Sequence, residues 1–196
     1  MMPKTLLHMI KMKSIGIIII LALFALSCKA QIIAVEDFED YPNELADGAY
    51  IKDINNVLGK YVGNWKGTYN NRNYEFRVIK QTFENNKLKY KEDRLLMRYQ
   101  ITDLNGSVIA TTLHLPDDNV YVIKGSYLSK SGSYVLNYQG LNAECGQNGN
   151  IYISVHGVNN SKLSLFLLVH GEVYPECTVG SVEQILPTDW IEMIKQ

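Results

Sequence analysis

The sequence predicts an all-β protein: an antiparallel meander of eight to nine strands that closes into a barrel, with one short N-terminal helix. Short runs rich in Tyr, Val, Ile and Leu follow one another from about residue 62, and turn residues separate them. Asn105-Gly106 is a strong hairpin signal, because both residues tolerate the positive φ of a tight turn. No second helix is expected to cover the sheet, so the sheet must close to bury its apolar face.

Residues 1–30 have the layout of a secretory signal peptide. Lys11 and Lys13 precede an apolar run over 15–26, which small residues follow. This run is shorter than the roughly twenty apolar residues that span a bilayer. Met12 is the expected start, so about eleven residues before it are expected to be extra. We therefore expect an exported protein that is periplasmic, anchored to the outer membrane or secreted.

Two processing sites fit this segment. The stretch from Ala25 to Cys28 resembles a bacterial lipobox, in which Cys28 would be lipidated and become the mature N-terminus. Alternatively, Cys28-Lys29-Ala30 offers small residues to an ordinary signal peptidase, which would leave Gln31 first. A lipid on Cys28 is the one membrane attachment that we expect.

Charge argues against nucleic acid as a partner. The whole chain has a formal net charge of -1, and without residues 1–28 it keeps 16 basic and 20 acidic residues. Phosphate binding requires a concentrated positive face, and no cluster of Lys and Arg occurs.

The elements follow in order after the signal segment. Residues 31–50 are expected to form an acidic, irregular leader, and 51–196 a single β-barrel domain. Apolar residues recur at helical spacing up to Gly59, which predicts a short helix over about 51–60. The segment 186–194 is either a ninth strand or a short helix, and we favour a strand. The eight preceding strands are expected at about 62–70, 73–84, 88–102, 106–113, 119–129, 133–140, 149–158 and 162–171.

Cys145 and Cys177 are predicted to form a disulfide. A hairpin turn at Asn159 and Asn160 places Cys145 opposite about residue 175, close to Cys177, and export supplies an oxidising compartment. The bond would contribute roughly 3 to 4 kcal/mol in the chain-entropy model. A catalytic thiol is the alternative, but it would need a nearby His base that no pattern indicates.

The sequence supplies no catalytic, cofactor-binding or metal-binding residues that we can assign. His156 and His170 point to one face, but the expected register places His156 opposite Ser164 and His170 opposite Asn150, about 20 Å apart. Two rings at that distance cannot share an ion. Signatures of nucleophilic elbows, zinc proteases, phosphate loops and dinucleotide folds are absent from the sequence. We therefore expect a protein that is not an enzyme, with a cryptic hydrolase as the alternative.

Tyrosine is unusually frequent, with 13 Tyr against 5 Phe. Ordinary β propensity explains this in part, since tyrosine favours strands. Its apolar ring with a polar tip also suits a ligand cavity or a contact face. The candidates for such a face are Tyr99, Tyr121, Tyr127 and Tyr138.

The step Gly63-Asn64-Trp65, between the expected helix and the meander, resembles the opening of the lipocalin-like (calycin) barrels. The resemblance implies that Trp65 is a structural plug at one end of the barrel, with Arg98 as the candidate arginine against it. Gly63 and Gly67 are expected to make room around the ring and to let the strand bend.

The chain also resembles an uncharacterised family of small exported proteins and lipoproteins of Bacteroidota. The shared residues are the ending Ser27 to Gln31, the approach Asp47 to Tyr50, and the stretches 62–69 and 74–76. That family implies no activity. The expected function is non-enzymatic binding, with a small apolar ligand or a cell-envelope component as partner and no cofactor. The alternative is a structural or interaction lipoprotein with a filled barrel.

Overall fold

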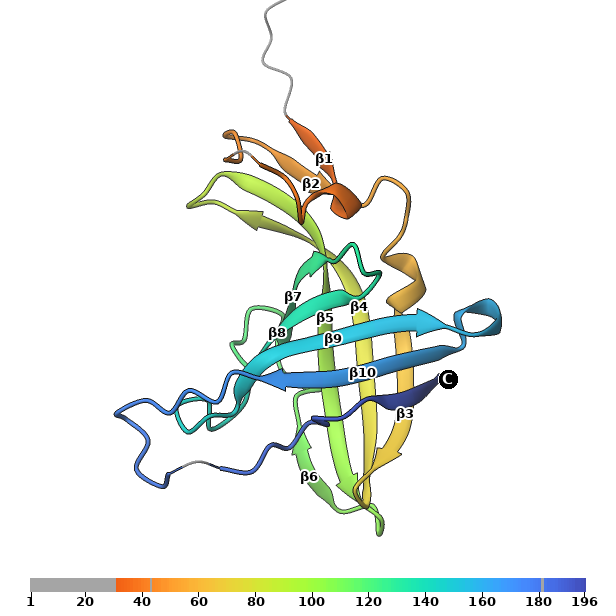
Figure 1. Cartoon of the computed structure of the whole chain (residues 1–196), viewed down its shortest axis with the longest axis vertical. Coiled ribbons are helices and arrows are strands. Elements are labelled where there is room, and N and C mark those ends of the chain that lie inside the picture. Colours follow the sequence, from red (N-terminus) through yellow and green to blue (C-terminus); the bar gives the residue numbers. More distant parts are fainter. Residues whose placement is uncertain (1–30, 43, 181) are drawn as a thin grey trace, which may run out of the picture. The chain divides into compact units, whose positions relative to one another are not determined.

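Eight antiparallel strands close into a barrel in the computed structural model (Figure 1), which confirms the predicted fold class. The structure describes residues 31–42, 44–180 and 182–196, so the predicted signal segment and Cys28 lie outside the described residues. The barrel strands are β3 (Gly63–Tyr69), β4 (Arg72–Asn85), β5 (Tyr90–Asp103), β7 (Ile123–Leu128), β8 (Tyr134–Gln139), β9 (Asn148–His156), β10 (Lys162–Val169) and β11 (Ile191–Lys195).

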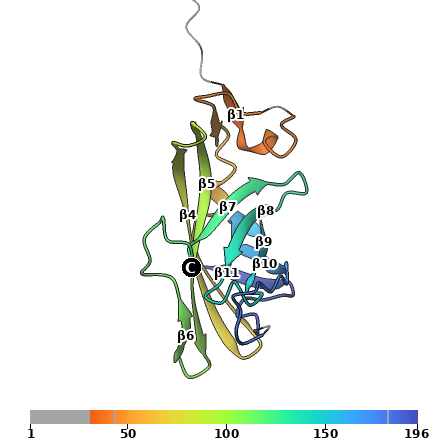
Figure 2. The same ribbon diagram turned by 90° about the vertical axis from the view of Figure 1, so that its left-hand side faces the viewer.

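The barrel strands pair in chain order, and two pairings close the ring. β7 pairs with β5, with Leu96 opposite Lys124, and β11 lies between β10 and β3, with Lys195 opposite Trp65. The segment that we predicted as a ninth strand or a helix is therefore the eighth barrel strand. The expected strand at 106–113 is β6 (Val108–Thr111), which pairs with β5 alone and lies outside the ring (Figure 2).

β5 has 14 residues, whereas β7, its neighbour in the ring, has six. One of its edges pairs in turn with β2 (Tyr50–Lys52), β7 and β6. β1 (Ile32–Ala34) adds to β2 in a parallel pair, so part of the expected irregular leader is ordered strand. The turn between β5 and β6 uses Gly106, whose φ of 88° is in the left-handed region.

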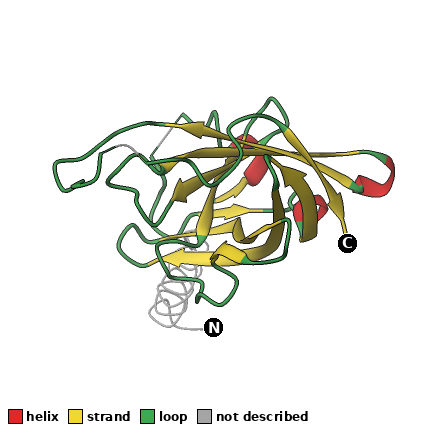
Figure 3. Cartoon of the chain, turned by 90° about the horizontal axis from the view of Figure 1, so that it is seen from below, coloured by secondary structure: helices red, strands yellow, loops and turns green. Residues whose placement is uncertain are grey.

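The helix predicted over 51–60 is wrong. Among the described residues, helical structure is limited to three 3-10 helices of three residues each (Figure 3): η1 (Val35–Asp37), η2 (Gly59–Tyr61) and η3 (Val158–Asn160). Ile51 instead pairs with Glu92 of β5. The buried Asp53 carboxylate accepts a hydrogen bond from the Leu58 N–H at 3.3 Å, and this contact holds a loop where a helix was expected.

Asp93 attaches this N-terminal loop to the barrel. Its carboxylate accepts hydrogen bonds from the Tyr50 hydroxyl at 2.8 Å, the Thr82 hydroxyl at 2.7 Å and the Asp53 N–H at 3.0 Å. Burial raises the pKa of Asp93, but these hydrogen bonds together with the charge of Lys80 outweigh burial, so its pKa is lowered overall.

The barrel interior is filled by side chains. Alternate residues of each strand point inward, and Trp65, Phe76, Tyr99, Leu136 and Leu165 are each at most 1% exposed. They belong to one hydrophobic cluster that joins all eight barrel strands. The Phe76 and Tyr99 rings, whose centroids are 6.4 Å apart, illustrate how neighbouring strands pack across the interior.

Trp65 is fully buried in this cluster, and its indole N–H donates to the Tyr61 carbonyl at 2.8 Å. The cation beside the ring is Lys195, whose Nζ lies 5.0 Å from the ring centroid. Arg98 is not against Trp65. It lies on the outer face of β5, where Nε donates to the Leu115 carbonyl at 3.0 Å and a terminal nitrogen pairs with Asp117.

Gly63 and Gly67 make room for β11 rather than for the tryptophan ring. A Cβ at Gly67 would lie 2.6 Å from Met193 Sδ and 2.9 Å from the Glu192 carbonyl oxygen. At Gly63, where φ is 144°, a Cβ would lie 2.8 Å from Cε of Lys195. These two glycines therefore allow the closing strand to approach β3.

Cys145 and Cys177 form the predicted disulfide. The register that led to it was two residues off, because His156 pairs with Lys162 rather than with Ser164. The turn is longer than expected, since it contains η3 with Asn159 and Asn160 at positive φ.

Candidate functional site

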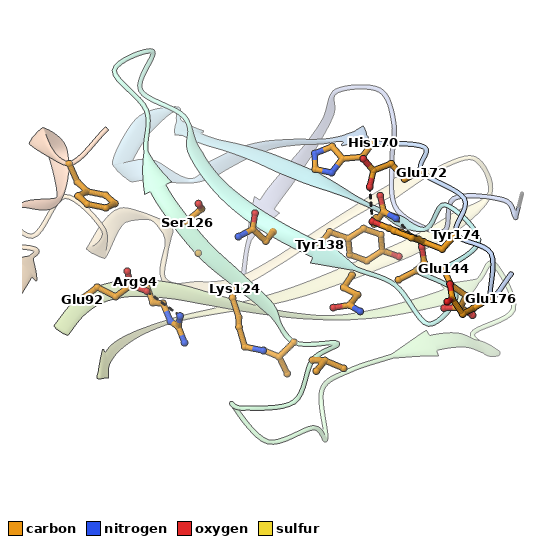
Figure 4. A pocket seen from close by; sticks show the side chains of 18 of the residues that line it. Glu92, Arg94, Lys124, Ser126, Tyr138, Glu144, His170, Glu172, Tyr174 and Glu176 are labelled. Atoms are coloured by element: carbon orange, nitrogen blue, oxygen red, sulfur yellow. Dashed lines mark hydrogen bonds and ion pairs between the residues drawn. The ribbon is translucent and has the colours of Figure 1, made fainter. Parts of the chain in front are cut away.

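A cleft of about 880 Å³ crosses the outer face of β5, β7, β8 and β9 (Figure 4). Its floor follows from strand alternation, because Asn137 and Gln139 point outward on β8 while Leu136 and Tyr138 are buried. The residues that line it are Phe38, Tyr90, Glu92, Arg94, Val120, Val122, Lys124, Gly125, Ser126, Asn137, Tyr138, Gln139, Ala143, Glu144, Asn148, His170, Glu172, Tyr174 and Glu176.

One end of the cleft is basic. Arg94 on β5 and Lys124 on β7 lie there, and Glu92 forms an ion pair with Arg94 at 3.1 Å. Burial raises the pKa of the Glu92 carboxyl, although the positive charge of Arg94 opposes this. Burial lowers the pKa of Lys124, and the charge of Arg94 lowers it further. Like charges are thus held close together on this outer face.

The opposite end of the cleft is acidic. Glu144, Glu172 and Glu176 line it together with His170 and Tyr174. The Tyr174 hydroxyl donates to the Glu172 carboxylate at 2.6 Å, and the Tyr174 N–H donates to the Glu144 carbonyl at 2.8 Å.

The disulfide positions this acidic end. Cys145 follows Glu144 directly, and its backbone forms an isolated antiparallel β-bridge with Val173. Its disulfide partner Cys177 directly follows Glu176. The bond therefore joins the two segments that carry the three glutamates.

The histidines are not brought together. The His170 N–H donates to the Asn148 carbonyl, and His156 lies eight residues further along β9, about 26 Å away at the usual rise per residue. His156 Nε2 lies 2.9 Å from the Ser164 hydroxyl oxygen. Across the described parts of the chain, no group of three or more His, Cys, Asp or Glu has the arrangement of a metal site.

The four candidate tyrosines do not form one face. Tyr99 and Tyr138 are 1% and 3% exposed and belong to the interior cluster, although Tyr138 also borders the cleft. Tyr121 and Tyr127 are half-buried. Tyr127 lines a second cleft of about 500 Å³ with Phe38, Glu39, Tyr41 and Leu45.

Sequence reasoning did not select Arg94, Lys124 or the glutamates. They come from separate elements, and no short motif contains them. The one available signal was alternation on β8, which places Asn137 and Gln139 outward.

None of the helices in the described ranges is both long and apolar enough to cross a membrane. In comparisons with known proteins, the model of the DUF6705 family, described as a family of unknown function, matches residues 12–164. No curated protein and no solved structure matches the chain.

Proposed function

The chain belongs to the DUF6705 family, and we propose that it is a non-enzymatic binding protein outside the cytoplasm that holds its ligand in the outer cleft. The observation that carries this proposal is the contrast between the packed barrel interior and the open cleft, whose lining is about half polar. A ligand cavity needs unfilled volume, and the inward positions are occupied by large side chains such as Trp65 and Tyr99.

This contrast also selects the kind of partner. The floor of the cleft carries amides from Asn137, Gln139 and Asn148, and its ends carry charges. Such groups suit a polar cell-envelope component better than the small apolar ligand that the sequence also allowed. The function therefore lies closer to the expected interaction protein with a filled barrel than to an interior carrier.

A location outside the cytoplasm is supported by the signal-like pattern of residues 1–30 and by the disulfide. Lipidation at Cys28 and cleavage after Ala30 remain the two routes. The intact mass of the protein purified from its own host separates them, because an acylated Cys28 adds lipid mass whereas cleavage after Ala30 leaves Gln31 first. The relation to lipocalin-like barrels and the origin in Bacteroidota stay predictions.

Blocking the cleft tests the proposal. Asn137→Trp places an indole on the exposed floor of the cleft, and Asn64→Trp is the matched control at an exposed position of β3. Native mass spectrometry of protein purified from its own host should detect a bound mass on the wild type and on Asn64→Trp but not on Asn137→Trp. A bound mass that survives Asn137→Trp would place the ligand elsewhere, and the complete lack of a bound mass would count against binding.

The hydrolase alternative has its own observation, because His170 and three glutamates line one end of the cleft. A hydrolase would need two of these groups to act as acid and base. Hydrolysis of an envelope glycan or ester by the wild type, and its loss in Glu144→Gln or Glu172→Gln, would replace the binding proposal with an enzymatic one.

A further inference from the structure

Arg94 is a cation of the cleft whose guanidinium is held by two contacts. Its guanidinium carbon lies 3.7 Å from the centroid of the Phe83 ring, so the group packs against the ring. One terminal nitrogen donates to Glu92 at 3.1 Å. The side chain is 12% exposed.

The Nε–H of Arg94 is buried and has no hydrogen-bond partner among the described residues. A buried donor without a partner is unfavourable, because it has lost its hydrogen bonds to water. An acceptor that reached Nε and the adjacent terminal nitrogen together would remove this cost, and the planar fork of arginine fits two oxygens of one oxyanion. An oxyanion is therefore a group that Arg94 is equipped to bind.

Lys124 supplies a second cation beside Arg94. Lys124 pairs with Leu96 of β5, which lies two positions from Arg94, so Lys124 and Arg94 are on the same outer face. Its ammonium donates to the Asn119 carbonyl at 2.7 Å and, at 3.5 Å, to the Asp118 carbonyl. An ammonium has three donors, so one is left for a ligand. The repulsion between Lys124 and Arg94 would be relieved by an anion between them.

The remaining charges limit the ligand to few negative groups. Glu92 already offsets one cation at this end. The acidic end lies beyond β8 and β9, and three inter-strand steps of about 4.8 Å each place it at least about 14 Å from Lys124. A polyanion that extended along the cleft would meet Glu144, Glu172 and Glu176 there and be repelled.

We propose that Arg94 and Lys124 form an oxyanion site, which binds the single carboxylate, phosphate or sulfate group of a ligand whose remainder is neutral or cationic along the cleft. This inference rests on the proposed function, because it names the ligand chemistry of the same cleft.

Chemical-shift mapping by NMR tests the site with D-glucuronate, inorganic phosphate and inorganic sulfate as probes and D-glucose as the uncharged control. At millimolar concentrations, at least one of the anions should shift the backbone amides around Arg94 and Lys124, and glucose should not. A response to glucuronate alone indicates a carboxylate ligand, and a response to phosphate or sulfate alone indicates a tetrahedral group. Equal shifts with glucose, or no shift with any anion, would overturn the proposal.

Variants distinguish anion binding at Arg94 and Lys124 from a general effect of surface charge. Lys124→Gln should weaken anion binding about tenfold or more, because one charge-assisted hydrogen bond is lost. Arg94→Gln should do the same, and Arg94→Lys should keep the charge but lose the paired contact. Arg77→Gln, an exposed cation on β4, is the control and should change nothing. Thermal melting checks that each variant is folded. If Arg94→Gln is not folded, Lys124→Gln alone tests the site.

Native mass spectrometry of variants purified from the protein's own host distinguishes a failure of the oxyanion site from a failure of the proposed function. The measured quantity is the ligand mass that stays bound to each variant. If Asn137→Trp removes it while Lys124→Gln and Arg94→Gln both retain it, the cleft binds its ligand without an oxyanion contact, and this inference alone fails. If Asn137→Trp retains it, the proposed function itself fails.

Discussion

The seam between β5 and β7 should depend on a contact between Gly125 and Tyr134. The Leu95 N–H donates to the hydroxyl oxygen of Tyr134 at 3.2 Å, and Tyr134 is 2% exposed. A Cβ at Gly125 would overlap this hydroxyl and lie 2.8 Å from the Leu95 carbonyl oxygen. Gly125→Ala should therefore displace the hydroxyl from the seam.

The magnitudes follow from these contacts. Tyr134→Phe leaves the Leu95 N–H without a partner, which should lower the free energy of unfolding by about 1–3 kcal/mol. Gly125→Ala should lose the same hydrogen bond and add overpacking of about 1–3 kcal/mol, for a total of about 2–5 kcal/mol. The double variant loses the hydrogen bond once. Its cost should thus be smaller than the sum of the two single costs by about 1–3 kcal/mol.

Urea denaturation followed by circular dichroism measures all four members of this cycle. Tyr127→Phe, at a half-buried position of β7, is the matched control and should change stability by less than about 0.5 kcal/mol. Single costs that add within about 0.5 kcal/mol would refute the shared contact. A Gly125→Ala variant as stable as the wild type would refute the crowding itself.

Three further outcomes are expected from the same measurement. Replacing Cys145 and Cys177 together by Ala should lower the free energy of unfolding by about 3–4 kcal/mol, since the bond closes a loop with a sequence separation of 32. An effect smaller than about 1 kcal/mol would contradict the chain-entropy estimate. Gly67→Ala should cost about 1–3 kcal/mol, because Met193 can move but the Glu192 carbonyl is backbone, and an unchanged stability would show that β11 shifts freely. Asp93→Asn should be less stable than the wild type at pH 7. Because the pKa of Asp93 is lowered in the fold, its ionised form stabilises the fold above the unfolded pKa of about 4, and this stabilisation is lost as pH falls through the folded value. The difference in stability between the wild type and Asp93→Asn should therefore shrink below about pH 4. A difference that stays constant with pH would contradict the role of the charge.

The strands of the barrel could be predicted because their signal is local. Alternation on each strand reports which residues point inward, and turn residues such as Asn70 and Asn71, both at positive φ, mark where strands end. The disulfide was also accessible, since a two-residue error in register keeps the same face and still brings Cys145 near Cys177.

The helix over 51–60 was wrong for a physical reason. The apolar spacing there does report burial, and Leu58 and Tyr61 are fully buried. However, Ile51 pairs with β5, and the Asp53 carboxylate accepts the hydrogen bond that the Leu58 N–H would have donated within a helix. Spacing alone cannot distinguish these two ways of burying the same side chains.

By itself, then, the sequence determined an all-β chain, the limits of most strands and a disulfide partner for Cys145, because these depend on period, turn chemistry and short separations along one hairpin. Only the tertiary structure decided that β6 leaves the ring, that β11 closes it, that the interior is filled, and that Arg94 and Lys124 line the same outer cleft. Each of these depends on which distant strand pairs with an edge of β5 or β3. That choice is made by the packing of the whole barrel, and no segment of the chain carries it alone.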